Sequence, residues 1–203
     1  MPSKTYSYLA LGDSYTIAES VPIYESFPYQ TVQLLRKAGH PVYAAEIVAK
    51  TGWTTGELQT GINNSKLLPA YDFVSLLIGV NNQYRARKTD EYAQQFESLL
   101  QQAIAFAGNK KQQVFVLSIP DWGVTPFANG RDKAAIAREI DAFNAINKSI
   151  SEKYNVNYIE ITAGTREAEK DVTLLAADQL HPSGKEYARW AVKLAEGIQK
   201  VLP

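Results

Sequence analysis

The sequence has no cysteine, only two histidines and no excess of charge of either sign. Without cysteine the chain cannot form disulfides, iron–sulfur clusters or thiolate zinc sites, and it has no cysteine nucleophile. His40 and His181 are too few for a three-histidine metal site, and neither lies in an H-E-x-x-H pattern. Lysine and arginine together number 21, as do aspartate and glutamate, so we expect no basic surface for nucleic acid.

Long hydrophobic runs are also missing. The longest nearly apolar run, residues 73–80, is interrupted by Ser75 and is much shorter than the ~20 residues of a membrane-spanning helix. Residues 1–5 contain no apolar leader segment. We therefore expect a soluble protein, either cytoplasmic or secreted after removal of a leader. Nothing in the sequence indicates its oligomeric state.

What the sequence does contain is a regular alternation of strand and helix patterns. Five β-rich runs are predicted strands: 6–11, 42–49, 73–78, 114–119 and 158–161. Helical apolar spacing lies between and after them, in 26–39, 54–61, 92–104, 136–154 and 187–201. With no repeat and no linker-like segment, the pattern predicts one domain over residues 1–203. Its fold class is α/β, a three-layer α/β/α sandwich around a mostly parallel sheet.

Local signals mark the start of two of these helices. Ser26 can cap the first helix, which Gly39 would close, with Pro41 beyond it. Thr54 and Glu57 have the spacing of a capping box for a short second helix that ends near residue 61.

In open α/β sheets, ligands bind at the carboxyl ends of the strands. Four segments directly follow predicted strands, and a fifth lies between the last strand and the last helix: 12–15, 51–55, 79–85, 120–123 and 178–182. Together they supply a serine hydroxyl, glycine amides, a carboxamide and an Asp/His pair. These groups are the parts of an acyl-transfer site.

Ser14 is the candidate nucleophile in this set and needs a neighbouring base. His181 is the preferred base, because His40 lies between Gly39 and Pro41 in a turn that would sit at the opposite sheet edge. Asp178, three residues before His181, could bind the imidazole Nδ1 and leave Nε2 to face Ser14. Taken singly, each motif could be an ordinary turn or loop. Their joint appearance at one edge favours a catalytic triad.

This constellation resembles the SGNH (GDSL-type) hydrolase family over nearly the whole chain, from about residue 6 to the last helix. The segment 11–14, Leu-Gly-Asp-Ser, matches the nucleophile block, Gly52 the second block, Asn81 the third, and Asp178 with His181 the last. The resemblance implies a flavodoxin-like five-stranded sheet and an ester hydrolase that needs no metal or cofactor. It also implies an oxyanion hole formed by the N–H groups of Ser14 and Gly52 and the side-chain amide of Asn81.

Two positions depart from the family pattern. Asn82 stands where the third block usually has aspartate, and Tyr15 stands where leucine usually follows the Gly-Asp-Ser tripeptide. Asparagine keeps an acceptor and adds donors, so Asn82 could still hold the oxyanion loop by hydrogen bonds. A structural polar role is the plainer interpretation of Asn82.

Several side chains near these motifs could contact substrate. The candidates are Tyr15, Trp53, Asn82, Tyr84, Arg85 and Trp122. The aromatic rings could stack on a sugar or line an acyl pocket, or they could simply pack between loops and helices. The arginine could bind an anion or pair with nearby acids. The turn-rich segment 120–130 is expected to form a wall of the cleft, and the lack of a long apolar lid disfavours an interfacial lipase.

The sequence therefore predicts a serine esterase that hydrolyses O-acyl esters through a Ser-His-Asp triad and an acyl-enzyme. A small acyl ester, an acetylated carbohydrate and a lysophospholipid all remain open as substrates. The alternative is a non-catalytic, flavodoxin-like ligand-binding protein that holds a phosphate or nucleotide at the end of the first strand. That reading leaves Asp178 and His181 unexplained, and prolines at 22 and 28 precede the first convincing helix. A catalytically inactive family member is disfavoured because every implied catalytic position is filled.

Overall fold

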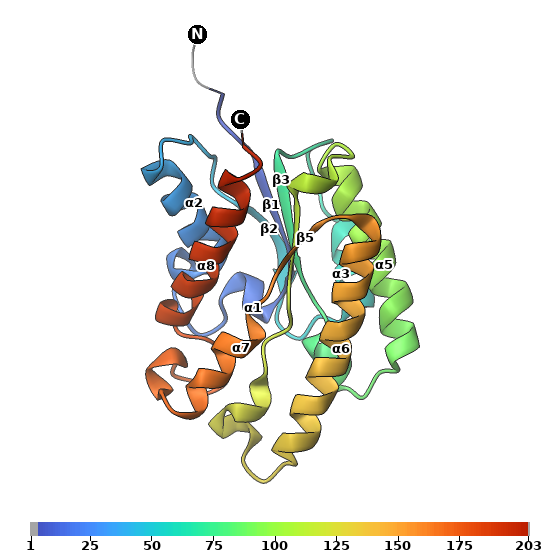
Figure 1. The fold of residues 1–203 in the computed structure, drawn as a ribbon, viewed down its shortest axis with the longest axis vertical. Coiled ribbons are helices and arrows are strands. Elements are labelled where there is room, and N and C mark those ends of the chain that lie inside the picture. The colour runs from blue at the N-terminus through green and yellow to red at the C-terminus, as the bar shows by residue number, and fades with distance from the viewer. Residues whose placement is uncertain (1–3, 203) are drawn as a thin grey trace.

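A computed structural model describes residues 4–202 and shows one five-stranded sheet in which all paired strands are parallel (Figure 1). The strands are β1 (Tyr8–Asp13), β2 (Glu46–Lys50), β3 (Phe73–Leu77), β4 (Val114–Leu117) and β5 (Asn157–Ile159). Their order across the sheet is β2-β1-β3-β4-β5. Residues 1–3, which begin the segment inspected for a leader, lie outside the described residues.

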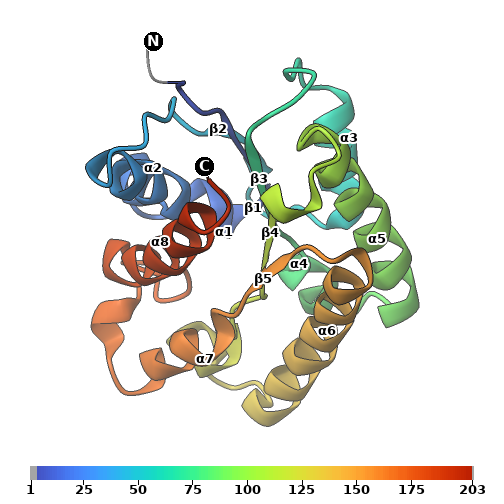
Figure 2. The ribbon, with the colours of Figure 1, turned by 45° about the horizontal axis from the view of Figure 1, so that its top comes forward.

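Helices cover both faces of this sheet, as Figures 1 and 2 show. One face carries α2 (Phe27–Lys37) and α8 (Gly184–Gln199), which pack against each other; the other carries α3 (Thr55–Asn63), α5 (Thr89–Phe106) and α6 (Lys133–Tyr154). The short α-helices are α1 (Ser14–Ile17), α4 (Val80–Tyr84) and α7 (Thr162–Thr165). Six 3₁₀ turns complete the elements of the described part of the chain: η1 (Ile23–Glu25), η2 (Lys111–Gln113), η3 (Trp122–Val124), η4 (Pro126–Ala128), η5 (Arg166–Glu169) and η6 (Val172–Leu174). The predicted three-layer α/β fold is confirmed.

Both predicted helix caps are present. The Ser26 hydroxyl accepts a hydrogen bond from the Tyr29 amide at 3.3 Å at the start of α2. At the start of α3, Thr54 and Glu57 form the reciprocal capping box, with the Thr54 amide donating to the Glu57 carboxylate at 2.8 Å. Each cap satisfies backbone N–H groups that would otherwise have no partner in the first helical turn.

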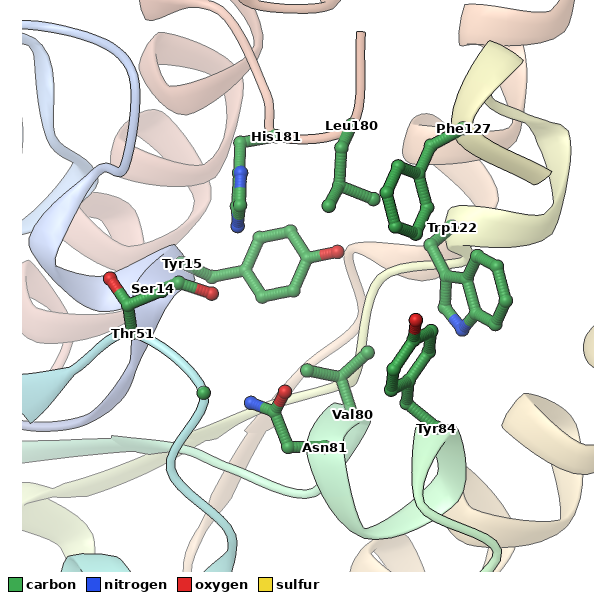
Figure 3. A pocket seen from close by; sticks show the side chains of 11 residues that line it. Ser14, Tyr15, Thr51, Val80, Asn81, Tyr84, Trp122, Phe127, Leu180 and His181 are labelled. Carbon is green, nitrogen blue, oxygen red and sulfur yellow. The ribbon is translucent and has the colours of Figure 1, made fainter. Parts of the chain in front are cut away.

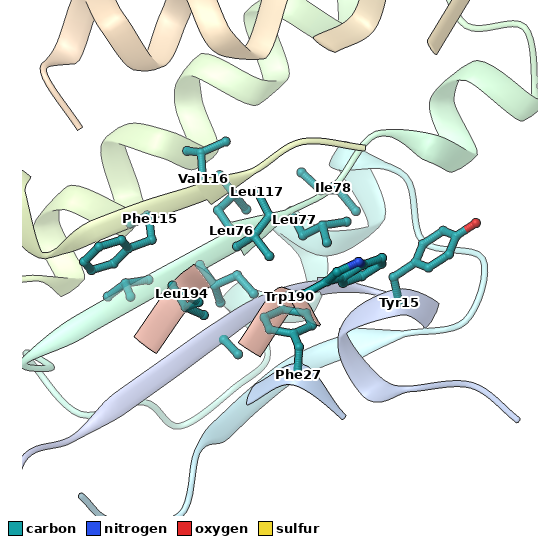
Figure 4. Close-up of a cluster of buried hydrophobic side chains, with 14 of the residues drawn as sticks. Tyr15, Phe27, Leu76, Leu77, Ile78, Phe115, Val116, Leu117, Trp190 and Leu194 are labelled. Carbon is teal, nitrogen blue, oxygen red and sulfur yellow. The ribbon is translucent and has the colours of Figure 1, made fainter. Parts of the chain in front are cut away.

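The core lies between the sheet and its helices (Figure 4). Strands β1, β3 and β4 are buried at every position, which explains why their sequences are continuously apolar or nearly so. On the α2/α8 face, the rings of Phe27 and Trp190 lie 6.0 Å apart and both are fully buried. The Trp190 indole N–H donates to the Glu186 carboxylate at 2.8 Å, so this large side chain is buried without an unpaired donor.

The strand ends differ from their predicted positions. β1 runs on to Asp13, and β2 begins only at Glu46, because Tyr6 and Val42 form a single isolated bridge and the chain then leaves the ladder. β5 ends at Ile159, two residues early. There the Ser118 hydroxyl accepts hydrogen bonds from the amides of residues 161 and 162, in place of a strand partner.

β1 has β2 on one side and β3 on the other, so the order in which successive strands are added across the sheet reverses beside β1. This is the position at which open α/β sheets bind ligands. In residues 4–202, no helix combines the length and the apolar character needed to cross a membrane.

Candidate active site

A pocket of about 190 Å³ lies where β1, β2 and β3 end (Figure 3). Its lining residues are Ser14, Tyr15, Thr51, Gly52, Val80, Asn81, Tyr84, Trp122, Phe127, Leu180 and His181. All five segments predicted to meet at this edge contribute to the lining. The remaining residue, Phe127, comes from the 120–130 segment that was predicted to form a cleft wall.

Ser14 is placed by a tight strand-to-helix junction. β1 ends at Asp13 and α1 begins at Ser14, and the Asp13 side chain caps the helix by accepting from the Tyr15 amide at 3.0 Å. A Cβ at Gly12 would lie 2.0 Å from Thr16 Oγ1 and 2.6 Å from the Leu77 carbonyl oxygen. The junction therefore has no room for a side chain at Gly12, and Ser14 follows directly at the end of β1.

Asp178 holds the imidazole of His181. Its Oδ2 lies 2.6 Å from His181 Nδ1, and its Oδ1 accepts from the backbone amides of Leu180 and His181, both at 3.0 Å. Partial burial raises the pKa of Asp178, but hydrogen bonds from the imidazole, the Ser20 hydroxyl and the two amides outweigh it and lower the pKa to about 2. The ring of Tyr15 packs 5.2 Å from the imidazole ring, centroid to centroid. The imidazole is thus fixed in orientation with Nε2 as its free nitrogen.

Ser14 and His181 face the same pocket, and Figure 3 shows both side chains pointing into it. Among the described residues, no hydrogen bond joins Ser14 Oγ to His181 Nε2, although the two residues line the same pocket. The serine hydroxyl is carried on a single rotatable bond, so its oxygen can turn toward the imidazole. His40, the other histidine, lies before β2, near Tyr6.

The three residues expected to supply oxyanion donors, Ser14, Gly52 and Asn81, all line the pocket. Within residues 4–202, neither the Ser14 N–H nor the Gly52 N–H donates to a side chain or to a loop carbonyl. Asn81 Nδ2 donates one hydrogen to the Trp53 carbonyl at 3.0 Å, which leaves its second hydrogen available. Gly52 has a φ of 83°, in the left-handed region that favours glycine. This arrangement can bind an oxygen that gains negative charge.

The predicted substrate contact at Asn82 is wrong. Asn82 is 1% exposed and does not line the pocket. Its Oδ1 accepts from the Thr55 amide at 3.0 Å and its Nδ2 donates to the Thr55 hydroxyl at 2.8 Å. Asn82 thus joins α4, which carries Asn81, to the first residue of α3, in agreement with the structural interpretation of this residue.

Trp53 and Arg85 do not line the pocket either. Trp53 packs on Gly61, where a Cβ would lie 2.1 Å from the indole ring. Arg85 donates to the Gly52 carbonyl at 2.5 Å and to the Glu57 carboxylate at 3.1 Å, so its guanidinium is committed to the loop that carries Gly52. Both predicted substrate contacts are replaced by roles in holding the pocket edge.

The other predicted aromatic residues do line the pocket. Tyr84 and Trp122, with Phe127, form one side of it, which we call the aromatic wall. Ring centroids are 5.4 Å apart for Tyr84 and Trp122, and 6.0 Å apart for Trp122 and Phe127. The Arg131 guanidinium lies 5.1–5.9 Å from all three ring centroids and donates to the Tyr84 hydroxyl at 3.1 Å. The aromatic wall therefore gives the pocket an apolar surface, and Arg131 stabilises the three rings through cation–π contacts and one hydrogen bond.

Five further residues at the site carry no distinguishing pattern in the sequence: Thr51, Val80, Phe127, Leu180 and Ser20. The first four lie inside segments already predicted to reach the pocket, but aliphatic and isolated aromatic side chains carry no chemical signature. Ser20 bonds Asp178 across 158 positions of sequence, and no pattern connects such a pair.

In residues 4–202, no three histidine, aspartate or glutamate side chains are grouped so that they could hold a metal ion. The chemistry available in the pocket is that of a hydroxyl, an imidazole–carboxylate pair and convergent N–H donors.

Comparison with known proteins places this geometry in context. The sequence model of the GDSL-like Lipase/Acylhydrolase family matches residues 10–189. No curated protein has a significantly similar sequence. Solved structures with the same fold include a lipase/acylhydrolase from Enterococcus faecalis, with 18% identity, a TM-score of 0.76 and coverage of 98% of this chain and 97% of that chain.

Two further solved structures share the fold. A member of the lipolytic G-D-S-L family from Veillonella parvula DSM 2008 has 17% identity and a TM-score of 0.74, covering 98% of this chain and 100% of that chain. An acetylxylan esterase from Geobacillus stearothermophilus has 20% identity and a TM-score of 0.73, covering 95% of this chain and 94% of that chain.

Proposed function

Since the chain belongs to the GDSL-like lipase/acylhydrolase family and is a carboxylic ester hydrolase, we propose that it cleaves small O-acyl esters through an acyl-enzyme on Ser14. The observation that carries the proposal is the imidazole of His181, held by Asp178 at 2.6 Å, in the same pocket as the Ser14 hydroxyl. A phosphate-binding or nucleotide-binding role does not account for this pair.

In the first half of the reaction, His181 Nε2 takes the proton of Ser14 Oγ while that oxygen attacks the ester carbonyl carbon. The N–H groups of Ser14 and Gly52 and the free amide hydrogen of Asn81 stabilise the negative oxygen of the tetrahedral intermediate. His181 then donates its proton to the alcohol oxygen, the bond between carbonyl carbon and alcohol oxygen breaks, and the acyl group stays on Ser14. The carboxylate of Asp178 stabilises the positive imidazole throughout.

In the second half, water replaces the alcohol. His181 Nε2 removes a proton from this water, whose oxygen attacks the acyl carbon, and the same donors stabilise the second intermediate. Its collapse returns the proton from His181 to Ser14 Oγ and releases the carboxylic acid. No redox step and no external cofactor enters this balance.

The pocket supports a small acyl group as the substrate part that lies closest to Ser14. Its volume of about 190 Å³ is below the ~300–1,000 Å³ of sites that enclose a whole drug-sized ligand, so only part of a larger ester fits inside. The aromatic wall offers an apolar surface on one side, and Tyr84 and Phe127 are each 43% exposed, so the wall extends to the surface. Acetyl or other short acyl esters of a sugar or an aryl alcohol fit this arrangement better than long-chain lipids do.

The test is an acyl-chain series of p-nitrophenyl esters, from acetate to octanoate, with acetylated xylo-oligosaccharides and lysophosphatidylcholine as alternative substrates. We expect the highest kcat/KM for the shortest acyl groups. Ser14→Ala and His181→Ala should lose at least ~10³-fold in kcat while remaining folded, by analogy with other triads.

His40→Ala is the matched control, because His40 lies away from the pocket, before β2. It should keep the parent kcat. Equal damage from His40→Ala and His181→Ala would show that the base is misassigned. A maximum at octanoate, or at lysophosphatidylcholine, would replace the short-acyl assignment by a lipid one.

A further inference from the structure

The turn that follows the nucleophile helix contacts three separate parts of the pocket. It consists of Ala18, Glu19 and Ser20, and we call it the 18–20 turn. Ala18 and Ser20 have φ values of 59° and 68°, in the left-handed region that non-glycine residues rarely adopt. The amides of Ala18 and Glu19 both donate to the Ser14 carbonyl, the latter at 3.0 Å, so the turn is fastened directly to the nucleophile's own backbone.

Ser20 connects this turn to the acid of the triad. Its hydroxyl donates to Asp178 Oδ2 at 2.7 Å, and the same oxygen accepts from His181 Nδ1 at 2.6 Å. Asp178 Oδ1 already accepts two backbone amides of its own loop. Ser20 is thus the only side chain other than His181 that bonds this carboxylate among residues 4–202, and it comes from a segment 158 positions earlier in the chain.

Glu19 connects the turn to the oxyanion loop. Its carboxylate accepts a hydrogen bond from the hydroxyl of Thr51, the residue that precedes Gly52. Because Glu19 and Ser20 are adjacent, the turn joins the segment after β1 to the segment after β2 and to the Asp178 loop at once. Ala18 and Ser20, on either side of Glu19, have left-handed backbone conformations, and the adjacent side chains of Glu19 and Ser20 reach different partners.

We propose that Ser20 is a positioning residue of the ester hydrolase and that it holds the Asp178 carboxylate against His181. Through its bonds to Asp178 and Thr51, the 18–20 turn also fixes the positions of Asp178 and Gly52 relative to Ser14. The inference rests on the proposed triad. Ser20 touches neither substrate nor the reacting atoms, and it acts through Asp178. Hydrogen bonds to an ionised acceptor are among the stronger ones in proteins, and one that fixes a carboxylate also fixes the imidazole that it orients.

The variants Ser20→Gly and Ser20→Asn separate the hydrogen bond from the backbone conformation. Glycine adopts a φ of 68° without strain but has no hydroxyl, whereas asparagine tolerates this region and offers an amide donor. We expect Ser20→Gly to lower kcat for p-nitrophenyl acetate about tenfold and to change KM by no more than about twofold. A tenfold loss lies near the lower end of the effects measured when a hydrogen bond to a charged group is removed. Ser20→Asn should recover most of the lost kcat, and both should melt close to the parent protein.

A second background shows whether Ser20 acts through Asp178. In an Asp178→Ala protein, Ser20→Gly should produce no further fall in kcat, because the shared acceptor is gone. The His181 Nδ1 proton resonance in the NMR spectrum supplies a readout apart from turnover, and Ser20→Gly should shift it.

Parent-like kcat and an unmoved Nδ1 resonance in Ser20→Gly would overturn the role of Ser20. A full additional loss in the Asp178→Ala background would also overturn it. Retained activity in Ser14→Ala would instead overturn the proposed function, so the two failures are distinguishable.

Discussion

Asn81 and Asn82 are adjacent in sequence but differ in environment. Asn81 lines the pocket with one amide hydrogen given to the Trp53 carbonyl, whereas Asn82 is buried and bonded to Thr55. We expect Asn81→Ala to lower kcat by ~10²–10³, the usual effect of deleting one oxyanion donor, with much less change in KM because the donor acts on the transition state. Steady-state kinetics on p-nitrophenyl acetate measure both parameters.

Asn82→Ala is the matched control for that experiment and should change kcat less than Asn81→Ala. The opposite result, with near-normal kcat in Asn81→Ala and a large loss in Asn82→Ala, would transfer the oxyanion role to Asn82.

Asp13, which precedes Ser14, is fully buried, and one of its oxygens has no hydrogen-bond partner within residues 4–202. Burial raises the pKa of Asp13 to about 7, although the hydrogen bond from the Tyr15 amide acts in the opposite direction. In the unfolded chain the same carboxyl ionises near pH ~3.9. Between these values the folded state holds a proton that the unfolded state lacks, so stability from this group falls as pH rises from about 4 to about 7.

Asp13→Asn removes this pH dependence while keeping an acceptor for the Tyr15 amide. We expect the variant to gain stability relative to the parent between pH 5 and pH 8, by up to about 3 kcal/mol. Urea denaturation of both proteins at the two pH values provides the free energies of unfolding. A stability difference that is the same at pH 5 and pH 8 would mean that Asp13 is ionised in the folded protein at both.

At the scale of elements, most of the sheet and its helices could be predicted, because periodicity and capping are local properties of sequence. Ser26 and the Thr54–Glu57 pair start their helices as expected. The strand ends could not be predicted, since they depend on distant partners. β5 ends where the Ser118 hydroxyl accepts hydrogen bonds from the amides of residues 161 and 162, and these bonds join residues more than 40 positions apart.

The same limit applies to the site. That Ser14 and His181 line one pocket, with Asp178 bonded to the imidazole, could be predicted from residue types and strand ends. Trp53 and Arg85 have equally suggestive chemistry, but Trp53 packs on Gly61 and Arg85 binds Glu57. Both partners belong to α3, and the way α3 packs at the edge of the pocket cannot be predicted from local sequence.

The coupling of α4 to α3 through Asn82 gives a prediction for stability. Asn82→Ala would leave the buried Thr55 amide without its acceptor, at a cost of about 1–3 kcal/mol. Asn82→Asp keeps the acceptor and places a negative charge at the N-terminus of α3, where the helix dipole favours it. We therefore expect the aspartate variant to be the more stable of the two in urea denaturation. The reverse order would show that burying the aspartate charge costs more than the bond from the Thr55 amide contributes, because both variants lack the donor to the Thr55 hydroxyl.

At the scale of the whole molecule, the pocket depends on the sheet as a unit. The residues that line the pocket follow β1, β2, β3 and β4 or precede α8. Of these strands, β1, β3 and β4 are buried at every position. We propose that the chain unfolds as one domain, so that activity and secondary structure are lost in the same transition. This is the expected behaviour when every part of a site is attached to one core.

Leu76→Ala tests this dependence at a distance from the chemistry. Leu76 lies in the middle of β3, fully buried, and does not line the pocket. Its truncation should cost about 2–5 kcal/mol through lost apolar burial and a residual cavity. Because Ser14, Asn81 and His181 are held by their own local bonds, kcat per active site, titrated with a phosphonate, should stay within about twofold of the parent in molecules that remain folded. Circular dichroism and residual activity, followed through the same thermal ramp, should move to lower temperature together. If activity disappeared well before the secondary structure, the loops of the pocket would form a separate unfolding unit, and the one-domain proposal would fail.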